Sequence, residues 1–145
     1  MPFLVDGSNL AGRAGSGAAD RQAQVGVVRL LLPWARQRRQ VVVVFDGPPN
    51  EQLAARYGPL TVRFAAPRSA DDAILATLGD QPGEWCVVTD DRGLRDACGA
   101  RGTRTMSARE LLVTLGAILP STGGEQREGP IDVADWEEWF RRGGG

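Results

Sequence analysis

Short runs of apolar residues alternate with longer segments of helical spacing along the first 120 residues of the chain. The clearest run is VVVVFD at 41–46, which is rich in β-branched residues and continuous enough to be buried on both faces. Similar runs predict strands at 3–5, 41–46, 60–65, 85–89 and 103–106. Helices are predicted at about 20–40, with Asp20 as N-cap and a kink or break at Pro33, and at 51–57, 69–78, 92–100 and 107–119.

This alternation predicts an α/β fold in which a central parallel sheet has helices on both faces. Right-handed crossovers favour the order 3-2-1-4-5 for the strands numbered along the chain. Strands one and four then lie side by side where the strand order reverses. Open α/β sheets bind ligands at that point, beyond the carboxyl ends of the strands, so we expect the functional site there.

Aspartates stand where the predicted strands stop or the next helices start. Asp6 follows FLV, Asp46 follows VVVVF, Asp71 lies in SADD and Asp91 follows CVVTD. Converging carboxylates repel one another unless cations lie between them, and Mg²⁺ or Mn²⁺ prefers oxygen ligands. The pattern therefore predicts a metal cluster at the carboxyl edge of the sheet, where Asp6 and Asp91 face each other.

Some of these acids and their neighbours also have a simpler explanation. Asp46 stands in a sequence typical of turns, and Asp71 and Asp72 suit a helix N-terminus for capping and dipole reasons alone. Asp90 fits an exposed turn. Asp6 is different, because a carboxylate directly after a buried strand is costly unless something pairs with it.

The residue types that are absent narrow the chemistry. The sequence has no histidine and no lysine, and all 17 of its basic residues are arginine. Ser-His-Asp and Cys-His enzymes, lysine Schiff bases, Walker-type phosphate lysines and histidine-liganded zinc sites are therefore excluded. Carboxylates are the main side chains left for hydrolysis.

Charge is distributed unevenly along the chain, although the net charge is only −1. Residues 1–120 carry 14 Arg against 12 acids, a net +2, and residues 121–145 carry 3 Arg against 6 acids, a net −3. Metal bound to some of the 12 acids would leave the main domain basic, and arginine suits phosphate. Arg13, Arg68 and Arg92 flank the predicted cleft and could bind phosphate groups, although most arginines are only solvated surface charges.

The sequence divides into a main domain at 1–119, a linker at 120–130 and an amphipathic helix with a short tail at 131–145. Trp136, Trp139 and Phe140 share one side of that helix, which either packs on the main domain or serves partner binding or self-association. No stretch approaches the roughly 20 apolar residues of a membrane helix, and we expect a cytoplasmic protein without membrane contact. Cys86 and Cys98 fit buried thiols better than a disulfide.

Glycines are frequent in DGSNLAGRAGSGAAD at 6–20, which includes a G-x-G before the first predicted helix. A dinucleotide site is disfavoured because Asp20 replaces the third glycine and Asp6 would repel a pyrophosphate. We interpret the segment as a mobile loop over the cleft.

Five separated segments carry a family resemblance: LVDGSNLAG at 4–12, VVVVFDG at 41–47, SADDAIL at 69–75, VVTDDRGL at 87–94 and SARELL at 107–112. Together they resemble the NYN domain, a branch of the PIN-like ribonucleases, in its YacP type. The resemblance implies a three-layer α/β fold and Mg²⁺- or Mn²⁺-dependent cleavage of RNA to a 5′-phosphate and a 3′-hydroxyl. It also implies frequent contact with translating ribosomes, and so with mRNA there, or with RNA-processing machinery.

The resemblance also assigns roles. Asp6, Asp71 and Asp91 match acids expected to hold metal, directly or through water; Asp46 orients a ligand or a metal-bound water. Asn9 contacts the scissile phosphate or Asp6. Gly93 stands where related PIN domains carry another acid, which weakens the expectation of a second tightly held ion.

Two hypotheses follow. The first is a metal-dependent endoribonuclease that hydrolyses RNA through an aspartate cluster. The alternative is a catalytically inactive PIN-like module that binds RNA, a ribosome or a protein partner.

Overall fold

The structure is a computed structural model and describes residues 1–13, 21–37 and 40–116. Six strands and five α-helices alternate along the described residues, together with one short 3₁₀ helix. The strands are β1 (Phe3–Asp6), β2 (Val41–Phe45), β3 (Arg56–Tyr57), β4 (Leu60–Phe64), β5 (Cys86–Val88) and β6 (Arg104–Met106). The helices are α1 (Gly7–Arg13), α2 (Arg21–Ala35), α3 (Ala70–Leu78), η1 (Pro82–Glu84), α4 (Arg92–Ala100) and α5 (Ala108–Thr114).

The strands form one sheet in the order β3-β4-β2-β1-β5-β6. Its five longer strands are parallel, and their arrangement confirms the predicted order 3-2-1-4-5. The prediction missed β3, which pairs antiparallel with β4 at the edge of the sheet. The short helix predicted at 51–57 is wrong for the same reason: Gly58, with a φ of +62°, turns the chain so that Arg56 and Tyr57 pair with the strand that follows.

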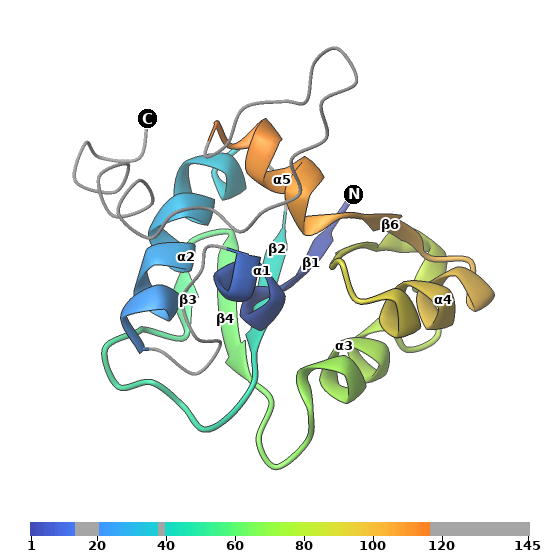
Figure 1. Cartoon of the computed structure of the whole chain (residues 1–145), viewed down its shortest axis with the longest axis horizontal. Coiled ribbons are helices and arrows are strands. Elements are labelled where there is room, and N and C mark those ends of the chain that lie inside the picture. The colour runs from blue at the N-terminus through green and yellow to red at the C-terminus, as the bar shows by residue number, and fades with distance from the viewer. Residues whose placement is uncertain (14–20, 38–39, 117–145) are drawn as a thin grey trace.

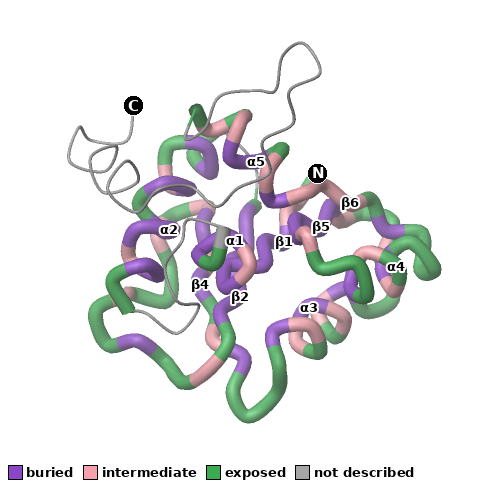
Figure 2. Tube along the Cα trace, in the orientation of Figure 1, coloured by how far each residue is buried: buried purple, intermediate pink, exposed green. Residues whose placement is uncertain are grey.

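Helices cover both faces of the sheet, as the α/β prediction requires (Figure 1). On one face α1, α2 and α5 pack on Val41, Val43 and Phe45, and on the other α3 and α4 pack on Val42 and Val44. Side chains of a strand alternate between its faces, so the continuous apolar run of β2 supplies both cores. The buried strands occupy the middle of the molecule (Figure 2).

Helix α1 corrects the prediction of a glycine-rich loop, because residues 7–13 of that segment are helical. Leu10 and Ala11 are fully buried and anchor the helix to the core. Gly7 permits its close approach to the sheet, since a Cβ at that position would lie 2.6 Å from Cε1 of Phe45. Residues 14–20, which are the rest of the predicted mobile loop and include Asp20, lie outside the described residues.

The remaining α-helices form where the sequence predicts helices, and two of them have the predicted N-cap residues. Ser69 accepts a hydrogen bond from the N–H of Asp72 at the start of α3, and Ser107 accepts one from Glu110 at the start of α5. Helix α2 contains Pro33 and ends at Ala35, earlier than predicted.

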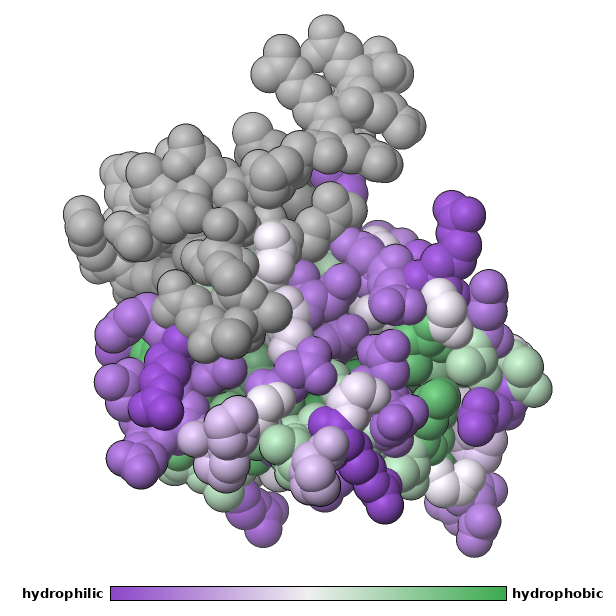
Figure 3. Space-filling model, turned by 60° about the horizontal axis from the view of Figure 1, so that its bottom comes forward, coloured by the Kyte–Doolittle hydropathy of each residue, from purple (hydrophilic) through white to green (hydrophobic). Residues whose placement is uncertain are grey.

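Cys86 and Cys98 are buried and free, which confirms that prediction. The predicted linker and tryptophan-containing helix fall outside the described residues and stay predictions. None of the described helices is long and apolar enough to span a membrane. Hydrophilic residues project from the face in Figure 3, with apolar residues between them, and Met1 is the one large hydrophobic side chain exposed within the described part of the chain.

Candidate acidic active site

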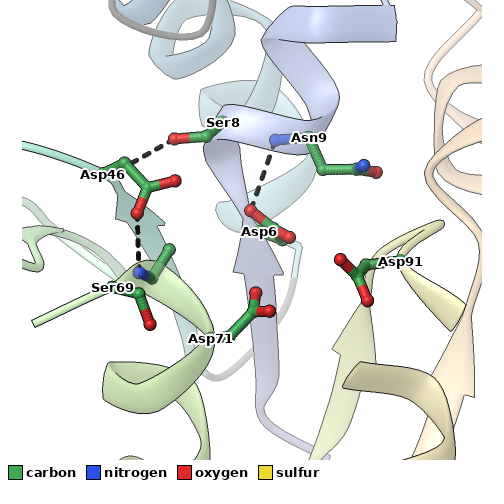
Figure 4. A pocket seen from close by; sticks show the side chains of 8 residues that line it. Asp6, Ser8, Asn9, Asp46, Ser69, Asp71 and Asp91 are labelled. Carbon is green, nitrogen blue, oxygen red and sulfur yellow. Dashed lines mark hydrogen bonds between the residues drawn. The ribbon is translucent and has the colours of Figure 1, made fainter. Parts of the chain in front are cut away.

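An open pocket of about 320 Å³ lies at the carboxyl ends of β1, β2 and β5. All five residues predicted to be catalytic line it, and we call it the acidic pocket. Its lining consists of Asp6, Ser8, Asn9, Asp46, Ser69, Ala70, Asp71 and Asp91. Parallel strands bring their carboxyl ends to one edge, which is why acids as far apart in sequence as Asp6 and Asp91 meet here. Figure 4 shows the carboxylates of Asp71 and Asp91 pointing toward Asp6.

Asp6 is the last residue of β1 and is only 5% exposed. Its carboxylate accepts hydrogen bonds from the Asn9 backbone N–H at 3.2 Å and from Oγ1 of Thr89 at 3.0 Å. Burial raises its pKa from 3.8 to about 6, although both hydrogen bonds oppose the rise, and the charges of Asp71 and Asp46 add to it. The protein therefore holds this carboxylate in an environment that disfavours its negative charge.

Asp71 lies in the first turn of α3 and is partly buried. Desolvation raises its pKa, and repulsion from Asp91, Asp46 and Asp72 raises it further. The pKa values of Asp6 and Asp71 thus both respond to neighbouring acids, so the carboxylates interact electrostatically across the acidic pocket.

Asp46 connects the end of β2 to the start of α3. Its backbone N–H donates to Oγ of Ser8 at 2.8 Å, and its Oδ1 accepts the N–H of Ala70 at 2.7 Å. Figure 4 shows both bonds. These contacts fix the position of Asp46, and they fit the expectation that it orients other groups.

Asp91 is exposed and begins α4, where its Oδ1 accepts the N–H of Leu94 at 2.9 Å. Asp91 therefore caps α4, which was not predicted from the sequence, and the same side chain also lines the acidic pocket. Gly93 follows closely, and a Cβ there would lie 3.3 Å from Oδ1 of Asp91. The acid that related domains carry at this position would therefore stand beside Asp91.

Thr89 joins the two sides of the acidic pocket, and sequence reasoning missed it. The residue is fully buried; its Oγ1 donates to Asp6 and accepts the backbone N–H of Asp91 at 3.1 Å. Threonine is common in strands for its β-propensity alone, so its presence at the end of a strand does not indicate this role. The only sequence signal was its position directly before two acids.

Asn9 hydrogen-bonds Asp6, which is one of the two contacts expected of it. Its backbone, rather than its side chain, bonds Asp6, and its Oδ1 accepts the backbone N–H of Asp90 at 2.9 Å. Asp90 in turn accepts the N–H of Ala108 at the start of α5 at 2.9 Å. Asp90 is therefore a partly buried structural connector rather than a free turn residue.

Two of the predicted arginines, Arg68 and Arg92, lie outside this lining. Arg68 and Arg92 are exposed, and the side chain of Arg13 falls outside the described residues. The described lining combines four carboxylates with no basic side chain. Such a donor set suits a hard divalent cation, because only a cation offsets the mutual repulsion.

The carboxylates do not form a closed ligand cage. Within residues 1–13, 21–37 and 40–116, no three acidic, cysteine or histidine side chains stand together as a ready set of ligands. Mg²⁺ commonly keeps several of its waters and uses one or two carboxylates, so an open acidic pocket fits an ion held partly through water. Direct contact of Asp6, Asp71 and Asp91 with one ion stays a prediction.

A doubly covered, mostly parallel sheet with acids gathered at its carboxyl edge defines an α/β protein whose site suits a divalent cation. The family model for the YacP-like NYN domain matches residues 3–121, and the chain belongs to this family. A ribonuclease-type function in general follows from that membership.

Solved structures agree on the fold. The chain is similar to the crystal structure of Rae1 (YacP) from Bacillus subtilis, with a TM-score of 0.63 and 21% identity over 98% of this chain and 78% of that one. A tryptophan-to-leucine mutant of the same protein gives a TM-score of 0.57 and 24% identity, over 97% and 79% of the two chains. No curated protein matches the sequence significantly.

Proposed function

We propose that this protein is a divalent-metal-dependent endoribonuclease that hydrolyses RNA phosphodiester bonds in the acidic pocket. One observation carries the proposal: four aspartates from four separate segments line one pocket that has no basic residue in its described lining. Burial and repulsion raise the pKa values of two of them, Asp6 and Asp71, which is an unfavourable arrangement unless a cation is bound. We further propose that the protein works in the cytoplasm on mRNA, including mRNA on the ribosome.

In this proposal Asp6, Asp71 and Asp91 hold Mg²⁺ or Mn²⁺, directly or through water. A bound divalent ion supplies a hydroxide at neutral pH and neutralises charge on the phosphate. Asp46, fixed by Ser8 and Ala70, orients a water or a neighbouring ligand. Asn9 positions Asp6 through its backbone N–H.

The test is cleavage of labelled single-stranded RNA by purified protein in Mn²⁺, with added chelator and the variant Asp6→Asn as negative controls. Asp96→Asn is the matched variant, because Asp96 is exposed on α4 and lies outside the lining of the acidic pocket. We expect cleavage by the parent and by Asp96→Asn only. Cleavage that persists in chelator or in Asp6→Asn would refute the assignment.

The second candidate function is an inactive RNA-binding module. The open arrangement of the carboxylates, without a ready set of three ligands in the described part of the chain, favours it. The same assay separates the two, since a module binds the RNA in Mn²⁺ and leaves it intact.

A further inference from the structure

A second, smaller cavity of about 70 Å³ adjoins the acidic pocket and shares Asp46 with it. We call it the Arg21 pocket. It is lined by Arg21, Gln24, Asp46, Gly47, Pro48 and Asn50. The two pockets meet at the turn that leaves β2, so a strand of RNA at the acidic pocket has the second one directly beside it.

The Arg21 pocket has a rigid, polar wall. Asn50 and Gln24 are 3% and 4% exposed, and Nδ2 of Asn50 donates to Oε1 of Gln24 at 2.9 Å and to the backbone oxygen of Arg21 at 3.3 Å. Oδ1 of Asn50 accepts the N–H of Gln52 at 3.0 Å. These bonds fix the first turn of α2 against the turn after β2, so the backbone of Arg21 is held beside Asp46 before any ligand arrives.

Charge indicates what the Arg21 pocket binds. RNA is an anion, yet the acidic pocket offers it four carboxylates and no described basic side chain. Among the described arginines, Arg21 alone appears in the lining of either pocket. A guanidinium donates to phosphate oxygens in a fork, so a phosphate is the group that Arg21 is best suited to bind.

We propose that the Arg21 pocket binds an RNA phosphate adjacent to the scissile one, with Arg21 as the contact. This inference rests on the proposed ribonuclease function and adds the residue that grips the substrate strand. Because Arg21 is exposed and only its backbone oxygen takes part in the hydrogen bonds of the wall, replacing its side chain leaves that wall in place. Asp46 faces the phosphate as the one negative wall residue, but its Oδ1 is engaged by Ala70.

The experiment measures affinity of single-stranded RNA by fluorescence anisotropy in Ca²⁺ at several salt concentrations, with a gel to confirm that the RNA stays intact. Arg21→Ala is compared with Arg29→Ala, an equal loss of charge at an exposed site of the same helix outside both pockets. We expect Arg21→Ala to weaken binding about tenfold and to lower the salt slope by about 0.7, the value for one phosphate on a single strand. Arg29→Ala keeps the parent's affinity and slope.

The outcomes separate this inference from the proposed function. If Arg21→Ala and Arg29→Ala bind with the same affinity and slope, the inference is wrong, even if the parent protein cleaves RNA in Mn²⁺. If Arg21→Ala alone loses affinity and slope while the parent cleaves nothing, the phosphate contact stands and the ribonuclease proposal fails. An Arg21→Lys variant that regains the slope and part of the affinity supports a charge-assisted phosphate contact.

In a cleaving protein the same contact gives a kinetic signature. The test uses a series of RNAs, each with one phosphate replaced by a neutral methylphosphonate at a different position. For the parent protein, the replacement at one of these positions should raise KM. That modification should have no further effect in Arg21→Ala, because the partner of the phosphate is already gone. Equal sensitivity of both proteins at every position would overturn the inference.

Discussion

Replacing Asp6 with asparagine should abolish cleavage and at the same time stabilise the metal-free protein. Burial raises the pKa of Asp6 from 3.8 to about 6, so the folded state binds the proton more tightly than the unfolded state does. That difference corresponds to roughly 3 kcal/mol by which ionised Asp6 destabilises the fold above pH 6. The asparagine side chain removes the charge but disturbs the bond from Thr89, which costs about 1 kcal/mol, so a net gain of about 2 kcal/mol is expected.

The stability difference between the parent and Asp6→Asn should depend on pH. Because the folded pKa is raised, stability of the parent falls as pH rises through the window from 3.8 to about 6. At about pH 5 the destabilisation is only roughly 1.6 kcal/mol, so the advantage of Asp6→Asn should shrink by about 1.4 kcal/mol between about pH 7.5 and pH 5. Urea unfolding of both proteins in chelator at the two pH values measures it.

Bound metal should make the parent more stable than Asp6→Asn, which reverses their order in chelator. An ion that binds only the folded parent stabilises it by about 2.7 kcal/mol at a concentration of about 100 times its Kd, whereas Asp6→Asn lacks a ligand and gains less. The exposed variant Asp96→Asn controls for general effects of lost charge. An Asp6→Asn variant less stable than the parent in chelator at neutral pH, or a gap between them that does not change with pH, would contradict this prediction.

Three further predictions concern the support of the acidic pocket. Thr89→Val should lower kcat about tenfold to a hundredfold, as for other residues that orient metal ligands, and Thr89→Ser should restore most of it; equal kcat in both variants would contradict the role. Gly7→Ala should lower the free energy of unfolding, measured in urea, by about 1–3 kcal/mol, because its Cβ would lie 2.6 Å from Cε1 of Phe45. The control is Gly12→Ala, whose Cβ has no neighbour within 4 Å; this variant should unfold with the same free energy as the parent or a higher one. Cleavage at subsaturating Mn²⁺ should fall as pH drops through about 6, where protonation of Asp6 competes with the ion; a rate that is flat from about pH 7.5 to 5 would exclude Asp6 as a ligand.

The sequence predicted the parts of the fold that one dominant physical signal determines. The β-branched run at 41–45 could form only a strand buried on both faces, and Ser69 and Ser107 offered their side chains to the first turns of α3 and α5. The acids at the end of β1 and after β2 and β5 were predictable for the same reason, because strand direction alone brings them to one edge of the sheet.

Features that depend on tertiary contacts were not predictable. The glycines of residues 7–13 suggested a loop, but burial of Leu10 and Ala11 makes the segment helical. The two-residue strand β3 exists only because β4 offers it an edge. Arg21 stood in the sequence as one arginine among 17, and only the fold places it beside Asp46.

The junction between β1 and α1 contains no connecting residue, since the strand ends at Asp6 and the helix begins at Gly7. Inserting a single residue there would turn every following side chain of α1 by about 100° and displace Leu10 from its place in the interior. Insertions at this junction should therefore prevent folding. The turn at Gly58 is exposed and lies at the sheet edge, so it should tolerate them. A library of one-residue insertions scored for soluble expression would reveal this contrast directly.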